Sequence, residues 1–258
     1  MNTADNSRCL SHGAVGRQAA PLLSVVIPVF NEHSTIAEVI RRVQAVPLEK
    51  EIIVVDDHST DGTSALLKKL EASATSAERV GIRISEIRFL YQDRNCGKGA
   101  ALRRGFAEAN GEIIIVQDAD LELDPADYPS LIAPILEGRA DVVYGSRFLQ
   151  SANRPAAMRY TLANRILTLS SNVLTGLRLT DVWIGYKVFR RSVLEGLTLK
   201  EDRFGFEPEF TAKIARNKWR VTEVPVSYRS RSVEEGKKIR LKDGINGMWA
   251  TVRYSLFG

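Results

Sequence analysis

Short apolar runs alternate with amphipathic stretches through the first half of the chain. Each apolar run is bounded by polar turns, so we predict strands at Leu22–Phe30, Glu51–Asp57, Ile84–Tyr91 and Ile113–Val116. The stretches between them carry apolar residues at helical spacing, as after the first strand with Ile36, Val39, Ile40 and Val43. A strand and a helix about every 30 residues is typical of a parallel sheet flanked by helices. The pattern therefore predicts an α/β fold.

The second half of the chain mixes helices and extended segments without a linker. Helices are predicted at Tyr128–Leu136, Pro155–Leu177 and Phe206–Asn217, and extended segments at Asp141–Arg147, Thr180–Phe189 and Arg220–Tyr228. The last apolar stripe has the spacing of an amphipathic helix and comprises Ile245, Met248, Trp249, Val252 and Leu256. We therefore expect one domain over residues 21–228, preceded by a flexible tail at 1–20. A basic loop and the amphipathic helix follow it, at 229–258.

The composition fits a soluble protein of a reducing compartment. With 258 residues, 44% of them hydrophobic and 26% charged, the chain can bury one large core. No apolar run approaches the roughly 18 residues that a membrane span needs, and the polar N-terminus lacks the apolar core of a signal peptide. Two cysteines, Cys9 and Cys96, give no disulfide framework. A cytoplasmic location is therefore expected.

Most of the net charge of +5 lies in one segment. Residues 229–242 hold six basic side chains and two acidic ones, which gives +4. A basic cluster of this kind predicts an anionic partner, which is a phosphate, a membrane surface or a nucleic acid. The acidic residues that end the predicted strands would repel a nucleic-acid backbone, so no nucleic-acid partner is expected.

Acidic residues follow the apolar run Ile113–Val116 directly. Asp118 and Asp120 come first, and Glu122 continues the series. Open α/β sheets bind ligands at the carboxyl ends of their strands, and two close carboxylates there repel each other unless a cation lies between them. Mg²⁺ or Mn²⁺ suits such oxygen ligands. The alternative is a solvated acidic loop that caps the next helix, because an Asp-x-Asp sequence alone is common.

Polar residues also end the first two predicted strands. Pro28, Asn31 and Glu32 have carbonyl and carboxylate oxygens that suit the edge of a nucleobase, and the alternative is a helix N-cap. Asp57 ends the second strand, where an acid can bind a base or a ribose hydroxyl. We favour a binding role for Asp57 because several acid-ended strands would meet at one edge of the sheet.

Three further positions carry candidate chemistry. Lys98 lies between two glycines at the start of a predicted helix, an arrangement that suits a phosphate, although a plain turn is the alternative. Arg147 ends a strand and suits phosphate recognition, although a surface arginine is equally compatible with the sequence. Glu207 and Glu209 are either a general base or acids that favour a helix start.

An ordered set of segments resembles family 2 glycosyltransferases. It comprises SVVIPVFNE, VVDDHSTDGT, RNCGKGAAL, QDADLELDP, VVYGSRF, TDVWIGYKVFRRSVL and FEPEFTAKIAR. The set covers roughly residues 22–240 and is most similar to the dolichol-phosphate mannosyltransferase and polyprenyl-phosphate glycosyltransferase group. The resemblance implies a GT-A fold with a Rossmann-like nucleotide-binding half, a nucleotide-sugar donor and inverting transfer.

The resemblance also implies roles for single residues. The metal would be bound by Asp118 and Asp120, and Arg147 would lie near the donor or acceptor phosphates. Combined with the candidate base at the helix start, this gives Asp120, Arg147 and Glu209 as the predicted catalytic residues. The nucleotide-sugar would contact Pro28, Asn31, Glu32, Asp57, Lys98, Asp118 and Glu122. The acceptor phosphate would contact Arg229, Lys237 and Lys238. Mannosyltransferases of this group often carry glutamine where this chain has Glu122, so the resemblance alone does not establish mannose as the sugar.

The predicted reaction moves a sugar from GDP-mannose or a UDP-hexose to a polyprenyl or dolichyl phosphate, with Mg²⁺ or Mn²⁺ as cofactor. The alternatives are a soluble saccharide or protein acceptor with Glu207 or Glu209 as base, and a non-enzymatic nucleotide-binding module. A lipid acceptor implies peripheral contact with the cytoplasmic membrane face or a membrane-protein partner. The C-terminal helix either lies in the membrane interface or packs on the core.

Overall fold

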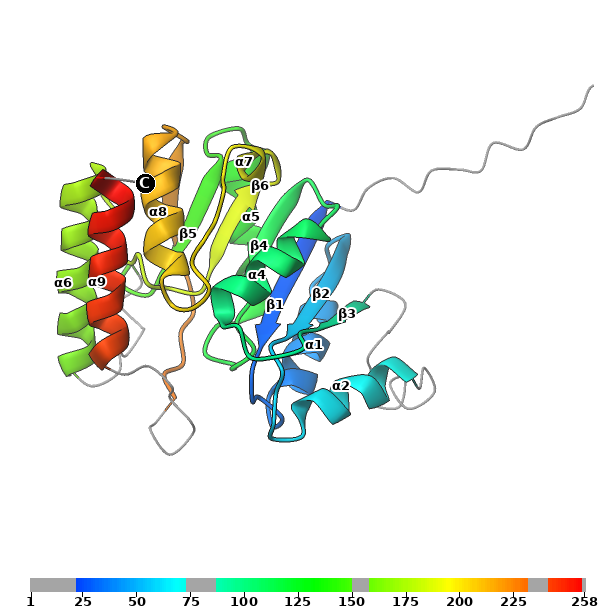
Figure 1. Ribbon diagram of the computed structural model, residues 1–258. Coiled ribbons are helices and arrows are strands. Elements are labelled where there is room, and N and C mark those ends of the chain that lie inside the picture. Colours follow the sequence, from blue (N-terminus) through cyan, green and yellow to red (C-terminus); the bar gives the residue numbers. More distant parts are fainter. Residues whose placement is uncertain (1–21, 73–86, 150–157, 232–240, 257–258) are drawn as a thin grey trace, which may run out of the picture.

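The computed structural model in Figure 1 describes residues 22–72, 87–149, 158–231 and 241–256. The tail predicted at residues 1–20 lies outside this range. So do Lys237 and Lys238, which were predicted to contact the acceptor.

A seven-stranded sheet forms the centre of the protein, with the order β3-β2-β1-β4-β6-β5-β7. The strands are β1 (Leu23–Val29), β2 (Lys50–Asp56), β3 (Ile87–Tyr91), β4 (Ile113–Val116), β5 (Val142–Ser146), β6 (Lys187–Arg190) and β7 (Val221–Pro225). Only β6 runs antiparallel to its neighbours, β4 and β5. The predicted mostly parallel α/β sheet is therefore confirmed.

Helices cover both faces of this sheet. Helices α1 (Ile36–Ala45), α2 (Thr63–Ala72) and α5 (Tyr128–Leu136) share one buried cluster with Val25 and Ile27 of β1. Helices α4 (Lys98–Ala107) and α8 (Phe206–Arg216) share a second cluster with Val26. Side chains alternate between the two faces along a strand, so a strand covered on both sides reads as an unbroken apolar run. This explains why all four residues of β4 are apolar and buried.

The strand order reverses between β1 and β4. From β1 the chain builds the sheet outward through β2 and β3, whereas β4 lies on the other side of β1. In open α/β sheets a crevice forms outside the carboxyl ends of the strands at such a reversal. The segments that leave β1 and β4 carry Glu32, Asp118 and Asp120, so the topology brings these acids together.

The segment predicted as extended from Thr180 to Phe189 is mostly a turn. Only Lys187–Arg190 forms a strand, and residues 180–186 curl toward the carboxyl edge of the sheet. The buried Lys187 holds this turn by donating hydrogen bonds to the carbonyl oxygens of Val182 (3.2 Å) and Ile184 (2.5 Å). Burial lowers the pKa of Lys187 to about 8. The prediction failed here because a tertiary contact, not local periodicity, shapes the segment.

Three helices stand side by side at the end of the sheet that carries β5 and β7 (Figure 1). They are α8, α6 (Met158–Thr175) and α9 (Leu241–Leu256), and α9 packs on both of the others. A small cluster of Ala212, Ala250 and Tyr254 joins α8 to α9. The C-terminal helix thus packs on the protein, one of the two predicted alternatives. Among the described helices, none combines the length and apolar character required to cross a bilayer.

Two short helices complete the fold. The 3₁₀ helix η2 (Pro125–Asp127) follows the acidic segment, and its N-cap Asp124 accepts a hydrogen bond from the N–H of Ala126. Helix α7 (Ser192–Glu195) follows β6. The acidic segment therefore ends in a cap at Asp124, while Asp118 and Asp120 precede the cap.

Candidate functional site

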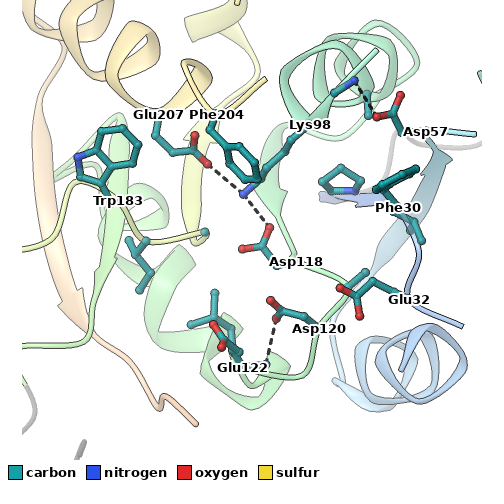
Figure 2. Close-up of a pocket in the computed structure, with 18 of the residues that line it drawn as sticks. Phe30, Glu32, Asp57, Lys98, Asp118, Asp120, Glu122, Trp183, Phe204 and Glu207 are labelled. Carbon is teal, nitrogen blue, oxygen red and sulfur yellow. Dashed lines mark hydrogen bonds and ion pairs between the residues drawn. The ribbon is translucent and has the colours of Figure 1, made fainter. Parts of the chain in front are cut away.

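A cleft of about 520 Å³ lies at the carboxyl edge of β1 and β4. Eight of the residues predicted from sequence line it, namely Pro28, Glu32, Asp57, Lys98, Asp118, Asp120, Glu122 and Arg147. They come from the end of β1, from loops that follow β1, β2, β4 and β5, and from the start of α4. The fold therefore brings residues from 28 to 147 into one site (Figure 2).

Lys98 pairs with two carboxylates inside the cleft. Its ammonium lies 2.8 Å from Asp118 Oδ1 and 3.0 Å from Glu207 Oε1, and Figure 2 shows it between them. Burial alone would lower the pKa of Lys98, but the two carboxylates outweigh burial and raise it. The lysine is therefore a fixed positive charge on the floor of the cleft.

Arg231 neutralises the second group of acids. Its guanidinium lies 2.9 Å from Asp120 Oδ2 and 3.1 Å from Glu32 Oε2, and its backbone N–H donates to Glu122 Oε1 at 3.0 Å. Burial, together with the neighbouring charges of Asp118 and Glu122, raises the pKa of Asp120 to about 7, and Arg231 opposes the rise. The three acids thus surround a position that a cation stabilises.

Asp118 and Asp120 supply hard oxygen ligands on one side of the cleft. Within the described residues no group of three or more acidic, histidine or cysteine side chains is arranged as a complete metal site. A divalent ion of the magnesium type needs only one or two carboxylates when water and a substrate phosphate complete its shell. The two aspartates therefore fit a metal that binds together with a phosphorylated ligand.

The absence of a side chain at Gly185 leaves room for the Asp118 carboxylate. A Cβ atom on Gly185 would overlap Asp118 Oδ2, so any side chain larger than hydrogen would displace the carboxylate. Gly185 belongs to the 180–186 turn, which also brings Trp183 and Ile184 to the cleft. Sequence reasoning missed these residues because it treated the segment as extended.

The two glycines at the start of α4 lie against another part of the chain. Cβ atoms on Gly97 and Gly99 would overlap the carbonyl oxygens of Asp202 and Glu201, respectively, so these glycines make room for the protein's own chain. The N–H groups of Cys96 and Gly97 donate to the Asp57 carboxylate, both at 2.7 Å. The approach of this backbone to a phosphate stays a prediction, since both Gly97 and Lys98 line the cleft.

Asp57 is thereby held at the wall of the cleft. Burial raises its pKa, and the hydrogen bonds from the Cys96 and Gly97 N–H groups oppose that rise. Gln92 adds a third hydrogen bond at 2.7 Å. Asp57 thus connects the end of β2 to the start of α4.

Arg147 is fixed by a buried acid. Its guanidinium makes two hydrogen bonds to the fully buried Asp181, at 2.7 and 2.8 Å. It also stacks on the Tyr228 ring with 5.0 Å to the ring centre. Burial alone would lower the pKa of Arg147, but Asp181 raises it. Arg147 therefore presents a preorganised positive charge to the cleft.

Three predicted residues lie outside the lining of the cleft. Asn31 has a left-handed backbone (φ 53°) and accepts a hydrogen bond from the Thr60 N–H at 2.8 Å, so it joins two loops. Arg229 is exposed, and Arg231 two positions later occupies the cleft instead. Nothing in the local sequence distinguishes Arg231 from the other basic residues around it.

Glu209 is the third of these residues, and its surroundings argue against the predicted role as a base. It is fully buried, accepts hydrogen bonds from the N–H groups of Lys200 and Glu201, and pairs with Lys213 at 2.6 Å. Glu207, by contrast, lines the cleft, and its buried Oε2 has no hydrogen-bond partner among the described residues. Glu207 and Glu209 point to different sides of α8, because residues two positions apart do not share a face of a helix.

Comparison with known proteins agrees with this arrangement. The family model described as Glycosyl transferase family 2 matches residues 24–198. An undecaprenyl-phosphate 4-deoxy-4-formamido-L-arabinose transferase of Salmonella paratyphi A is 33% identical over 225 residues, which cover 85% of this chain and 64% of that protein. The transferase of the same name from Pseudomonas aeruginosa is 32% identical over 220 residues, which cover 84% and 60%. The chain thus spans less than two thirds of the length of these relatives.

Solved structures with the same architecture include glucosyl-3-phosphoglycerate synthase from Mycobacterium tuberculosis. Its complex with Mn²⁺, uridine diphosphate and glucosyl-3-phosphoglycerate has a TM-score of 0.66 at 23% identity, covering 91% of this chain and 80% of that chain. Its complex with Mn²⁺, uridine diphosphate and phosphoglyceric acid has a TM-score of 0.67 at 21% identity, covering 92% and 80%. At this identity the likeness concerns the fold alone, and it confirms the predicted GT-A fold.

Proposed function

Because this chain belongs to glycosyl transferase family 2, we propose that it transfers a sugar from a nucleotide-sugar to a polyprenyl phosphate. The observation that carries the proposal is the cleft itself. Asp118 and Asp120 lie at the reversal of strand order, and Lys98, Arg147 and Arg231 surround the same space. The names of the Salmonella and Pseudomonas relatives support the acceptor class, and the Mn²⁺ and uridine diphosphate of the similar structures support the donor class.

The donor would lie along the cleft from β1 toward β4. Pro28, Glu32 and Asp57 would contact the nucleoside, and Lys98 would contact the diphosphate. Asp118 and Asp120 would hold Mg²⁺ or Mn²⁺, which would supply positive charge to offset the charge that develops on the departing nucleoside diphosphate. Glu122 would orient the donor through the contact that it makes with Arg231. The donor sugar is a hexose of UDP or GDP in this proposal.

The acceptor phosphate needs orientation more than activation. A phosphate monoester is ionised near neutral pH, so its oxygen can attack the anomeric carbon without a protein base. The new carbon–oxygen bond forms as the bond to the nucleoside diphosphate breaks, with inversion at the anomeric carbon. Arg147, held by Asp181 and Tyr228, would bind the acceptor phosphate. Arg229, Lys237 and Lys238 remain proposed contacts of the same acceptor.

The test is a transfer assay with a matched acid. The protein and Mn²⁺ are incubated with a panel of UDP- and GDP-sugars, with and without polyprenyl phosphate. We expect product with one donor, and a loss of at least about 100-fold in Asp120→Asn. Asp124→Asn changes an acid of the same segment that caps η2 outside the cleft, and it should retain activity within a few fold. Full activity of Asp120→Asn at saturating Mn²⁺ would contradict the proposal.

Glu207 favours a second candidate, transfer to a hydroxyl of a saccharide or protein. A hydroxyl acceptor needs a general base, and Glu207 has a buried oxygen in the cleft without a hydrogen-bond partner among the described residues. Glu207→Gln would then abolish transfer to hydroxyl acceptors. Loss of its ion pair with Lys98 would affect both acceptor classes equally, so the ratio of the two activities decides. Nucleotide binding without turnover of any donor would instead indicate a non-enzymatic module.

A further inference from the structure

We propose that Gln117 positions the loop that carries the proposed metal ligands, and thereby sets the affinity of the protein for a divalent metal. The proposal rests on the function proposed above and deepens it, because it names a positioning residue for the same site. We call residues 118–127 the acidic loop. We call the three buried side chains of Gln117, Tyr128 and Tyr186 the Gln117 cluster.

The side-chain amide of Gln117 makes three hydrogen bonds inside the protein. Its oxygen accepts from the hydroxyls of Tyr128 (2.8 Å) and Tyr186 (2.9 Å), and its nitrogen donates to the carbonyl oxygen of Asp118 (2.9 Å). All three side chains of the cluster are fully buried. Burial raises the pKa of both tyrosines, so both hydroxyls keep the proton that they donate. Hydrogen bonds in such surroundings are strong, because the local dielectric constant is low.

The Gln117 cluster joins the two ends of the acidic loop. Gln117 directly follows β4, and Tyr128 is the first residue of α5. The two residues are 11 positions apart in sequence, and the hydrogen bond between their side chains closes the loop at its base. A closed loop has fewer conformations than an open one, so its side chains lose less freedom when they bind a ligand.

Tyr186 connects the cluster to the 180–186 turn. It directly follows Gly185, whose lack of a side chain leaves room for Asp118 Oδ2. The carbonyl oxygen of Tyr186 also accepts a hydrogen bond from the N–H of Gly145 on β5, at 3.1 Å. The cluster therefore holds both the Asp118 backbone and the turn that lies against the Asp118 carboxylate.

The acidic loop needs this support because its backbone is strained. Leu121 lies between Asp120 and Glu122 with a left-handed backbone (φ 60°), which residues other than glycine rarely adopt. Strained backbone persists only where the surrounding contacts determine it, and it is common at ligand sites. The middle of the loop is also held, since the Thr35 hydroxyl donates to the Ala119 carbonyl at 2.7 Å. The position of the carboxylates is therefore built into the ligand-free protein.

Positioning of this kind shows in metal affinity. Groups that orient metal ligands without touching the metal typically change its affinity about 10- to 100-fold when they are removed. Gln117 lies outside the lining of the cleft, so it acts on the metal through the Asp118 backbone. The alternative is a cluster that only stabilises the fold, as buried hydrogen bonds do elsewhere. Such a cluster would affect unfolding and leave metal binding intact.

The test compares Mn²⁺ affinity in variants that break single hydrogen bonds. Tyr128→Phe opens the base of the acidic loop and Tyr186→Phe releases the turn, while the packing of the two rings, with centres 6.0 Å apart, is kept. We expect each variant to weaken Mn²⁺ binding in the presence of uridine diphosphate about tenfold, measured from the electron paramagnetic resonance of free Mn²⁺. Gln117→Leu breaks all three bonds and should weaken it about 10- to 100-fold.

Uridine diphosphate without metal should bind all these variants like the wild type, because the proposed nucleoside contacts come from other loops. Tyr144→Phe is the matched control. Tyr144 is another fully buried tyrosine, its hydroxyl lies 2.9 Å from that of Thr211, and it is outside the lining of the cleft. It should lower the free energy of unfolding about as much as Tyr128→Phe, with unchanged Mn²⁺ affinity. Wild-type Mn²⁺ affinity in the three cluster variants, or an equal loss in Tyr144→Phe, would overturn the proposal.

Hydrogen exchange of the ligand-free protein tests the positioning without any metal. The reporter is the N–H of Glu122, which donates to Asp120 Oδ1 at 3.1 Å within the acidic loop. Gln117→Leu should raise its exchange rate at least about tenfold and leave the amides of α2 unchanged, and the two tyrosine variants carry this test if Gln117→Leu does not fold. The same rates in wild type and variants would show that the cluster does not hold the loop.

The outcomes also separate this proposal from the proposed function. Sugar transfer by the wild type, with Mn²⁺ affinity and loop exchange that do not depend on the cluster, would remove the role of Gln117 alone. Loop exchange and Mn²⁺ affinity that depend on the cluster, without transfer from any donor, would contradict the proposed function alone.

Discussion

Two cationic side chains neutralise most of the acidic side chains of the cleft. Lys98 pairs with Asp118, and Arg231 pairs with Asp120 and Glu32. Each aspartate of the proposed metal site therefore already has a positive partner when no ligand is bound. Binding of a divalent ion has to replace these contacts, which predicts that the two cations turn toward the donor phosphates.

Gly185 gives the sharpest test of the position of Asp118. A methyl group at Gly185 would overlap Asp118 Oδ2, so Gly185→Ala should displace the carboxylate without opening the core. We expect transfer activity to fall on the order of 100-fold, since a shift near 1 Å can cost that much. Gly196→Ala is the control, because a Cβ atom at Gly196 would lie 3.5 Å from its nearest neighbour, Asn217 Nδ2, and would fit without displacement. Activity assays with melting curves of both variants check this, and wild-type activity in Gly185→Ala would refute it.

Arg231 should be essential to the stability of the ligand-free site. Arg231→Gln would leave Glu32, Asp120 and Glu122 without their shared cation in a partly buried position. We expect the free energy of unfolding in EDTA to fall by about 3 kcal/mol. Mn²⁺ with a nucleoside diphosphate should recover part of the loss. Arg229→Gln, two residues earlier and exposed, should change stability by less than about 0.5 kcal/mol in the same denaturant titration.

The sequence predicted some of these residues and not others for a physical reason. Asp118 and Asp120 were found because a buried strand directly precedes them, and strand ends define the binding edge. Arg231 was missed because nothing local distinguishes it from its basic neighbours. The glycines at 97 and 99 suggested a close approach to the backbone, but a sequence does not show that residues 201 and 202 of the same chain lie against them.

At the scale of elements, the local hydrophobic pattern predicted the strands correctly where burial requires apolar side chains. The predicted strands of the first half agree with β1 to β4 within a few residues, because β1, β2 and β4 are buried by helices on both faces and the edge strand β3 still buries Phe89. The helix around α6 was also predicted, yet its apolar stripe faces outward. Periodicity identifies a helix and its apolar side, but the partner of that side is a property of the assembled fold.

The 180–186 turn is an element set by one buried charge, and pH should reveal it. Burial lowers the pKa of Lys187 to about 8 in the folded protein, from an ordinary value of 10.5. Between these values the unfolded chain binds more protons, so the contribution of Lys187 to stability rises with pH. We expect the wild type to gain up to about 3 kcal/mol over Lys187→Met between pH 8 and 10.5.

Denaturant titrations at several pH values measure this difference. Lys200→Met is the matched variant, because it removes a lysine that is exposed rather than buried. A constant difference for Lys187→Met would show that Lys187 is not buried as described. The comparison uses pairs of variants at each pH, so the titration of other groups cancels.

At the scale of the whole molecule, the fold places two cavities next to each other. The carboxyl edge of β1 and β4 carries the acids of the cleft, and a second cavity, lined by Arg94, Lys200 and Arg253, lies beside α9. Asn95, Arg203 and Phe204 line both cavities. This division follows from the order of the strands and from the packing of α6, α8 and α9 at one end of the sheet.

The donor and the metal should bind as a unit, and thermal unfolding can show it. Metal alone competes with Lys98 and Arg231 for Asp118 and Asp120, whereas a diphosphate offers those cations a new partner. We therefore expect Mn²⁺ alone or uridine diphosphate alone to shift the melting temperature little. Both together at about 100 times their dissociation constants stabilise by about 2.7 kcal/mol, which raises the melting temperature by roughly 5–10 °C.

Matched variants separate this coupling from general ion effects. Asp120→Asn should lose the joint shift, and Asp124→Asn should keep it, because Asp124 lies outside the cleft. A full shift with Mn²⁺ alone in the wild type would mean that the carboxylates bind metal without help from a phosphate. In that case Lys98 and Arg231 would not compete with the metal for Asp118 and Asp120, and their ion pairs would not explain the joint binding of metal and diphosphate.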